Sequence, residues 1–562
     1  MLIDACTLPK HHVVETDVCI IGSGPAGITM ARELIGKQVQ VCVLESGSLD
    51  ADPQIQALTQ ADTTGDPQMS LFLSRYRQVG GNSNRWAIKI GNGQMGVRYA
   101  PLEAIDFEQR DWLPYSGWPF SRAQLNPYYE RAQAVCKAGV LDYETDRWES
   151  QQAPRLPLDP DRFTTTMFQF GPRDVFAQEY RQALAQADNI TLYYNATVVE
   201  LVANDAAKAV NRVRVTNLQG SHFTVAAKVF VLAQGGLENA RLLLASKQQQ
   251  TCGLGNQHNL VGRFFMDHPL VGGGMLKPGS PKLFDKMALY DLRRVNQVPV
   301  LGKLTPAKAL MQQEQLLNVG VLLFPRPSLR QFEAIASFKC LLESLADGNL
   351  PDQIPQHLLK TLQGLDYVAL ASFLAAKHRQ SLLHGFGRGG WSDLANNQRR
   401  FKLFQLFYQV EQSPNPNNRV TLSADRDRLG CQKLELHWRW NELDASSIRR
   451  THELLAAELS RSGLGELSLE DPTREPQVLT GGVAHHMGTT RMHIDPRQGV
   501  VDENCQVHGI ENLFVAGSSV FPTGGYANPT LTIVALSLRL ADHVHQTLQH
   551  TQRATVEVGQ VV

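Results

Sequence analysis

The chain has 562 residues, which is too long for one ordinary hydrophobic core and predicts two or more domains. Its 54 basic and 54 acidic side chains balance, and 43% of its residues are hydrophobic against 19% charged, as in a globular protein. No basic run is long enough to follow a phosphate backbone, which excludes sequence-independent nucleic-acid binding and favours a neutral substrate.

Eight cysteines are scattered along the chain, without a CxxC pair and without the spacing of metal ligands. Several lie inside apolar runs, so we expect small buried side chains in a reducing compartment and no metal site. The N-terminal stretch has no positively charged start followed by an apolar segment, and no continuous apolar run is long enough to span a membrane. The default expectation is a cytoplasmic protein without a transmembrane segment.

The first predicted element is a buried strand from Asp17 that leads through a glycine-rich turn into a helix, in DVCIIGSGPAGITMARELI. Gly22, Gly24 and Gly27 have the G-x-G-x-x-G spacing, which permits a tight turn, close approach of a pyrophosphate and close packing of helix on strand. A second strand, VQVCVLE, ends in Glu45, whose carboxylate would accept from a ribose hydroxyl and disfavour a 2'-phosphate. This context favours dinucleotide binding over a glycine turn that serves packing alone.

Residues 88–190 contain turns rich in proline and aromatic residues, which lead to a helix near 124–136. We expect these aromatic side chains to pack between domains rather than to bind a sugar. A third strand of nucleotide-binding type ends near Ala233, before a glycine pair and a helix from about Leu237, and a fourth apolar strand covers 512–518.

These distant pieces predict one nucleotide domain with a second domain inserted, which suits a flavin buried between domains better than an exchangeable nicotinamide. The expected fold class is α/β, or α+β overall: a discontinuous Rossmann-type FAD-binding domain, and a substrate domain built on an antiparallel or mixed sheet plus helices. The expected ranges of the FAD-binding domain are 12–130, 191–274 and 478–548, and those of the substrate domain are 131–190 and 275–477.

Within 275–477, LLNVGVLLFP and KLELHWRW alternate like strands of a sheet that would cover the flavin. Between them, at about 328–385, amphipathic patterns predict a helical hairpin on the surface, and a lid, a subunit contact or a membrane-surface contact are the alternatives. The last residues, 549–562, are polar and are expected to form a flexible tail.

Six stretches resemble the glucose-methanol-choline (GMC) family of FAD-dependent oxidoreductases, in the family's order from residue 17 to about 545. They read IIGSGPAG, VGGNSNRWA, AQGGLENARLLL, VGRFFMDHP, HHMGTTRM and NLFVAGSSVFPTGGYANPTLT. Within the family, the chain is most similar to the branch of pyranose oxidases and bacterial sugar or polyol dehydrogenases. The resemblance implies oxidation of a CH–OH group with FAD as cofactor.

One departure from that branch concerns how FAD is held. Some pyranose oxidases attach FAD through a histidine just before the tryptophan of the second stretch, whereas this chain has Arg85 before Trp86. The resemblance therefore implies non-covalent FAD. The candidate FAD contacts are Gly22, Gly24, Pro25, Ala26, Gly27, Glu45, Gly81, Asn82, Ser83, Gly517, Ser518, Asn528, Pro529 and Thr530.

The chemistry requires a base, because the hydroxyl proton must leave as hydride leaves the carbon, and neutral histidine is the usual choice near pH 7. The resemblance places this base at His485 and a substrate-orienting amide at Asn528. Asn528 before Pro529 also fits a plain N-cap of the next helix, whose positive end would face the flavin.

Other polar residues near these motifs receive weaker assignments. His486 is expected to pack or to bond to the backbone, and His268 and His508 are expected to be structural histidines. Gln412 lies in EQSPNPNNRVTLS, which resembles a family segment near the active site, so it is a candidate substrate contact.

The leading functional prediction is oxidation of a sugar, polyol or related alcohol by hydride transfer to flavin N5, with His485 as the base. The alternatives are a lyase on the same scaffold, like the family's hydroxynitrile lyases, and a flavin-binding protein without turnover. The sequence leaves the electron acceptor open among oxygen, a quinone and a redox partner, and it is compatible with a homo-oligomer.

Overall fold

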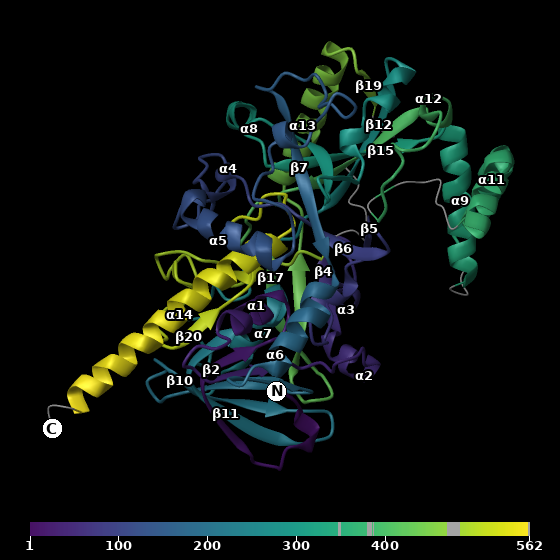
Figure 1. Ribbon diagram of the computed structural model, residues 1–562. Helices are drawn as coiled ribbons and strands as arrows, with labels where there is room; N and C mark the ends of the chain where they lie inside the picture. The colour runs from purple at the N-terminus through teal and green to yellow at the C-terminus, as the bar shows by residue number, and fades with distance from the viewer. Residues whose placement is uncertain (347–349, 379–384, 386, 469–483, 560–562) are drawn as a thin grey trace.

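The computed structural model describes residues 1–346, 350–378, 385, 387–468 and 484–559. Three β-sheets organise these residues, and the chain passes between them several times. Figure 1 shows the first sheet at the base of the molecule, the second sheet above it, and the C-terminal helix crossing toward the base.

The first sheet gathers the predicted nucleotide-binding pieces. Its strand order is β1-β8-β3-β2-β11-β10-β9, with β20 also paired to β11. The neighbours from β1 to β11 are parallel, as is β20 on β11, whereas β10 and β9 extend the sheet in antiparallel fashion. The strands are β1 (Leu2–Asp4), β2 (Val13–Ile21), β3 (Val41–Leu44), β8 (Ile190–Tyr194), β9 (Thr197–Ala203), β10 (Val210–Thr216), β11 (His222–Leu232) and β20 (Leu513–Val515).

Parallel pairing places the carboxyl ends of β2, β3, β11 and β20 at one edge of this sheet. The turn after β2 opens α1 (Pro25–Glu33), and the turn after β11 opens α7 (Gly235–Ala245). The central strands are almost completely buried, which explains their unbroken apolar sequences. The expectation of one Rossmann-type unit assembled from N-terminal, middle and C-terminal pieces is confirmed.

Two long helices cover this unit. Helix α14 (Thr530–Gly559) packs against α1 and against α5 (Arg122–Val135), and Arg131 of α5 pairs with Asp542 of α14. The predicted helix near 124–136 matches α5. Helix α14 continues through most of the segment that we expected to be a flexible tail, and residues 560–562 lie outside the described ranges.

The second sheet is antiparallel, in the order β19-β12-β16-β15-β14-β7-β6-β5 with β13 beside β14. Its strands are β5 (Ile88–Gly91), β6 (Gln94–Tyr99), β7 (Phe163–Pro172), β12 (Leu270–Pro278), β13 (Arg293–Val295), β14 (Val298–Pro306), β15 (Val319–Arg326), β16 (Leu403–Val410) and β19 (Gly465–Ser468). Strands β5 and β6 lie in the range 12–130 that we assigned to FAD binding, and they pair in this second sheet.

One predicted strand lies elsewhere. LLNVGVLLFP contains β15 of the second sheet, but KLELHWRW contains β18 (Gln432–Trp438), which pairs with β17 (Arg419–Arg426) and β4 (Ala61–Gly65) in a separate three-stranded sheet. Trp438 and Leu436 of β18 are buried in the small core of this sheet with Phe265. The alternating pattern predicted the strand correctly but not its partners.

In its described residues, the predicted helical insertion at about 328–385 contains α9 (Leu329–Ala346), α10 (Ile354–Gln363) and α11 (Leu365–His378). Figure 1 shows α9 and α11 to one side of the molecule, away from the sheets. Leu358, Leu359 and Leu362 of α10 are 49–64% exposed. Among the described residues, no helix has both the length and the apolar character that crossing a bilayer requires.

Candidate active site

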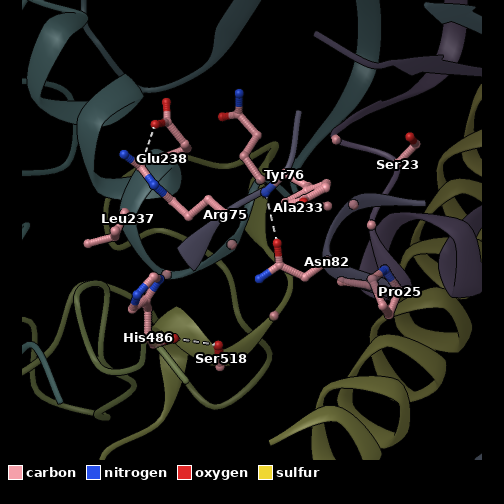
Figure 2. Close-up of a pocket in the computed structure, with 18 of the residues that line it drawn as sticks. Ser23, Pro25, Arg75, Tyr76, Asn82, Ala233, Leu237, Glu238, His486 and Ser518 are labelled. Atoms are coloured by element: carbon pink, nitrogen blue, oxygen red, sulfur yellow. Dashed lines mark hydrogen bonds and ion pairs between the residues drawn. The ribbon is translucent and has the colours of Figure 1, made fainter. Parts of the chain in front are cut away.

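A large hollow lies at the carboxyl edge of the first sheet. It contains about 1420 Å³ of space free of atoms, part of it open to solvent. Its wall is formed by the turns after β2, β3 and β11, by the segment around 75–86, and by the C-terminal segments 484–486, 517–518 and 528–533. In Figure 2, side chains from these separate segments converge on one space.

The turn after β2 has the geometry that its glycines predict. Gly22 has a φ of 108°, and a Cβ added there would lie 2.5 Å from the carbonyl oxygen of Ala233. A Cβ at Gly27 would collide with the carbonyl oxygen of Gly22, so Gly27 serves helix packing and does not line the hollow. A Cβ at Gly24 would meet no heavy atom within 4 Å, so the N-terminus of α1 faces open space that suits a phosphate.

Glu45 lies at the end of β3 and lines the same hollow. One carboxylate oxygen accepts from the backbone N–H of Ser23 at 2.9 Å and from its hydroxyl at 2.7 Å, and the other accepts from the N–H of Gly47 at 2.7 Å. Burial raises the pKa of Glu45, against the lowering effect of these hydrogen bonds. This carboxylate therefore fixes the glycine-rich turn and also lines the hollow.

The segment around Gly81 closes one side of the hollow. Asn82 accepts from the N–H of Tyr76 at 2.9 Å and donates to the carbonyl of Ser74 at 3.0 Å (Figure 2). Ser83 is buried, donates to the carbonyl of Gly80 and does not line the hollow. Trp86 lines it and packs edge-on against other rings, whereas the Arg85 guanidinium lies 5.1 Å from the ring centre of Tyr76.

The C-terminal wall comes from Gly517, Ser518 and the start of α14. Gly517 has a φ of 107°, and the Ser518 hydroxyl donates to the carbonyl of His486 at 2.7 Å. Asn528, Pro529 and Thr530 all line the hollow, so the positive end of α14 points at its contents.

The structure brings His485 and Asn528 together. Asn528 Nδ2 lies 3.2 Å from His485 Nε2, and both residues line the hollow. Asn528 Oδ1 accepts from Gln409 at 3.1 Å, so this side chain is engaged with other side chains and not in capping α14. Burial, and then the neighbouring His268, lower the pKa of His485 well below its ordinary value, which keeps the imidazole neutral.

The three other histidines named from the sequence lie in different surroundings. His486 also lines the hollow, but its ring packs 5.7 Å from that of Phe265, and burial lowers its pKa to about 3. His268 is completely buried, and its Nδ1 lies 3.1 Å from Nδ1 of His485. His508 lies away from the hollow and bonds through Nε2 to the carbonyl of His493 at 2.8 Å.

Gln412 is not among the residues that line the hollow. Its Oε1 accepts from the N–H of Asp267 at 3.1 Å and from the indole of Trp438 at 3.0 Å, and its Nε2 donates to the carbonyl of Arg439. The side chain is 1% exposed, so its polar atoms serve the joint between 267 and the three-stranded sheet. We therefore leave Gln412 out of the proposed substrate site.

A buried charge cluster at the wall was not predicted from the sequence. Arg75 and Glu238 form an ion pair there (Figure 2), and Arg77 and Arg241 reach the same carboxylate at 3.0 and 2.7 Å. Although burial alone would raise it, these three guanidiniums hold the pKa of Glu238 far below its usual range. The cluster joins the segment before Gly81 to α7. The sequence does not predict it, because Arg75 and Arg77 are far along the chain from Glu238 and Arg241.

Comparisons with known proteins agree with this geometry. Residues 17–263 match the FAD binding domain family, and residues 414–537 match the GMC oxidoreductase family. The fructose dehydrogenase large subunit of Gluconobacter japonicus is 25% identical and aligns over 95% of this chain and 98% of its own length. The 2-methyl-1,2-propanediol dehydrogenase of Mycolicibacterium austroafricanum is 22% identical, over 94% and 95% respectively.

Solved structures agree on the fold. The crystal structure of formate oxidase superposes with a TM-score of 0.53 and 18% identity, covering 97% of this chain and 100% of that one.

Proposed function

This chain belongs to the GMC oxidoreductases, and from that premise we propose that it oxidises the CH–OH group of a sugar, polyol or related alcohol. The observation that carries the proposal is the pairing of His485 with Asn528 at the wall of the hollow, 3.2 Å apart. A neutral imidazole can accept the hydroxyl proton, and an amide donor beside it can orient the alcohol oxygen.

The residues present fit FAD. The open space at the N-terminus of α1 suits the pyrophosphate, and the Glu45 carboxylate suits the ribose hydroxyls. The N-terminus of α14 lines the same hollow, and its positive end would stabilise negative charge on the bound cofactor. When bound, FAD supplies the acceptor for the hydride that leaves the alcohol carbon.

His485 supplies the proton acceptor in this proposal. Its Nε2 takes the hydroxyl proton of the alcohol while the C–H bond yields its electron pair as hydride, so the alcohol becomes a carbonyl compound. Because the pKa of His485 is lowered, its imidazole is unprotonated near neutral pH and can accept a proton. Asn528 donates from Nδ2 to the alcohol oxygen and so orients the C–H bond.

The substrate class rests on the balance of charge in the chain and on the relatives. Two of the relatives with near-complete alignments are named for fructose and for 2-methyl-1,2-propanediol, both neutral polyhydroxy compounds, and two others are named for paromamine and 6'''-hydroxyparomomycin C. We propose a neutral polyol or sugar for this chain. We also propose that residues 12–130, 191–274 and 478–548 form the FAD-binding domain, and a cytoplasmic location stays a prediction.

The test is anaerobic mixing of the purified holoenzyme with a panel of sugars, polyols and simple alcohols, with a dye acceptor and with oxygen in parallel. A substrate bleaches the flavin band near about 450 nm, a property of the cofactor. If no alcohol bleaches it, the chain is a lyase or a flavin-binding protein without turnover, and the proposal fails.

The manner of FAD attachment is tested on the same sample. Arg85 stands where some pyranose oxidases have the linking histidine, and its guanidinium lies over Tyr76. We propose that FAD is held without a covalent bond. Acid precipitation should leave the yellow colour in the supernatant, and colour that stays with the washed pellet contradicts this.

A further inference from the structure

A chain of hydrogen bonds links six residues through the proposed catalytic pair. Arg98 donates to Oε1 of Gln409 at 2.9 Å, and Gln409 Nε2 donates to Oδ1 of Asn528 at 3.1 Å. Asn528 Nδ2 lies 3.2 Å from Nε2 of His485, and His485 Nδ1 lies 3.1 Å from Nδ1 of His268. The last contact joins Nε2 of His268 to the carbonyl oxygen of Gly524 at 3.1 Å.

The two ends of the chain fix the direction of every bond within it. A guanidinium can only donate, and a backbone carbonyl can only accept. Because Arg98 donates, Gln409 accepts through Oε1 and donates through Nε2, which also bonds to the carbonyl of Tyr526 at 2.6 Å. Asn528 must then present Nδ2 to His485.

The opposite end gives the same answer. Because Gly524 accepts, His268 carries its proton on Nε2, and its Nδ1 is left as an acceptor when the ring is neutral. His485 therefore donates from Nδ1 to His268, and its Nε2 carries the lone pair. Both directions of reasoning assign the same tautomer to His485, with Nε2 as the basic atom.

We propose that His268 is a positioning residue that holds His485 in the Nδ1–H tautomer and so directs the basic Nε2 toward Asn528 and the hollow. This inference rests on the proposed function, because it assigns His268 a part in the same proton transfer. Without an acceptor at His268, only the donor Nδ2 of Asn528 still favours a proton on Nδ1 of His485. A share of His485 would then carry the proton on Nε2, the nitrogen that must be free.

Asp267 fixes the backbone of His268 and His485 relative to each other. Its Oδ1 accepts from the backbone N–H of His268 at 2.7 Å and from that of His485 at 2.9 Å. The strand-like segments that carry the rings are also joined by paired backbone bonds between Met266 and Met487. The ring pair is thus fixed through its backbone, and a change of the His268 side chain leaves this support in place.

The first measurement reads the tautomer directly. Nitrogen-15 NMR of the histidine-labelled holoenzyme near neutral pH distinguishes protonated from unprotonated ring nitrogens, and His485→Gln and His268→Leu assign the two rings. The expected result is Nδ1–H for His485 and Nε2–H for His268 in the wild type, with a mixture of tautomers at His485 in His268→Leu. A wild-type His485 protonated on Nε2 overturns the proposal without reference to activity.

The second measurement is anaerobic flavin reduction by the best alcohol. His268→Leu should lower the rate about 10- to 100-fold with FAD still bound, the usual effect of losing a supporting hydrogen bond to a functional histidine. His268→Asn restores an acceptor near the position of Nδ1 and should recover most of the rate. His452→Leu is the matched control, because His452 is also buried and bonds through Nδ1 to Tyr408 at 2.9 Å, away from the hollow.

The outcomes separate this inference from the proposed function. If no alcohol reduces the wild type, the proposed function fails, and the NMR result still decides the tautomer. If the wild type is reduced but His268→Leu reacts at the wild-type rate with one unchanged tautomer at His485, the role of His268 is refuted. Equal rate losses in His268→Leu, His268→Asn and His452→Leu also refute it, because they indicate a general loss of packing.

Discussion

At the scale of single residues, His485 and Asn528 contribute unequally to the proposed reaction. His485→Ala removes the proton acceptor and should lower the rate of flavin reduction by about 10²- to 10⁴-fold with FAD still bound. Asn528→Ala removes one orienting hydrogen bond and should cost less. Anaerobic stopped-flow reduction of each FAD-loaded variant makes the comparison.

His486 provides the contrasting variant in that experiment, because it adjoins His485 but packs against Phe265. His486→Ala should mainly lower stability, as truncation of a packed side chain does. If His486→Ala abolishes reduction while His485→Ala reacts normally, the assignment of the base is off by one residue.

Glu45 is expected to govern cofactor retention. Glu45→Gln keeps the shape of the side chain but turns one acceptor into a donor that faces Ser23 or Gly47. The variant should lose FAD more readily on dilution, while the fully loaded enzyme reacts nearly as the wild type does. Unchanged FAD retention with a large loss of turnover would contradict this role.

Residues that lie in short continuous sequence motifs could be predicted from the sequence, and their contacts with distant segments could not. Gly22 and Glu45 lie in a motif whose spacing indicates dinucleotide binding, whereas His485 and Asn528 lie in stretches to which the family resemblance assigns a role, so all four could be named before the structure was known. His268 lies in a motif too, but it was expected to be only structural, because nothing in its neighbourhood indicates the ring that it meets.

At the scale of elements, the charge cluster around Glu238 ties α7 to the segment that leads to Gly81. Glu238→Gln would leave three buried guanidiniums without their carboxylate, and loss of one partner of a buried pair costs about 3–5 kcal/mol. We expect a lower urea midpoint and weaker FAD retention. Glu453→Gln is the control, since Glu453 pairs with Arg450 on the surface, where such pairs contribute about 0–1 kcal/mol. Equal effects of the two variants would contradict the argument.

The pairing of elements was the part of the fold that the sequence predicted least well. KLELHWRW alternates as a strand should, but a period of two is the same in every sheet, and the pattern does not identify the neighbour. Its neighbour β4 comes from residues 61–65, which are nearly all exposed and carry little apolar signal. The parallel strands of the first sheet were easier to predict from the sequence, because burial on both faces gives continuous apolar runs.

At the scale of the whole molecule, buried neutral histidines make stability depend on pH. The folded pKa of His486 is about 3, below the ordinary value of 6.5, so between these values the unfolded chain binds a proton that the folded chain does not. Stability from this group is therefore complete above pH 6.5 and is lost as pH falls toward 3.

His486→Phe should remove this dependence. The free energy of unfolding of the variant, minus that of the wild type, should rise by up to about 1.4 kcal/mol per pH unit as the pH falls between the unfolded and folded pKa values of His486. Urea unfolding of both proteins across the window, with FAD in excess, measures the difference. Buried carboxyl groups such as Asp267, whose pKa burial raises to about 6, act in the opposite sense but are common to both proteins. Parallel pH profiles would refute the prediction.

The position of β20 also bears on how the protein is made. Strand β20 pairs with β11, and the wall of the hollow is completed by residues 517–533, close to the end of the chain. Ribosomes add about 5–20 residues per second, so the N-terminal glycine turn emerges well before the segments that enclose a flavin with it. Until then, only residues 230–232 of β11 lack their partner, because β2 and β10 pair with the rest of this strand. We therefore expect capture of FAD to be a late event in biosynthesis, after the segments that complete the wall of the hollow have been made.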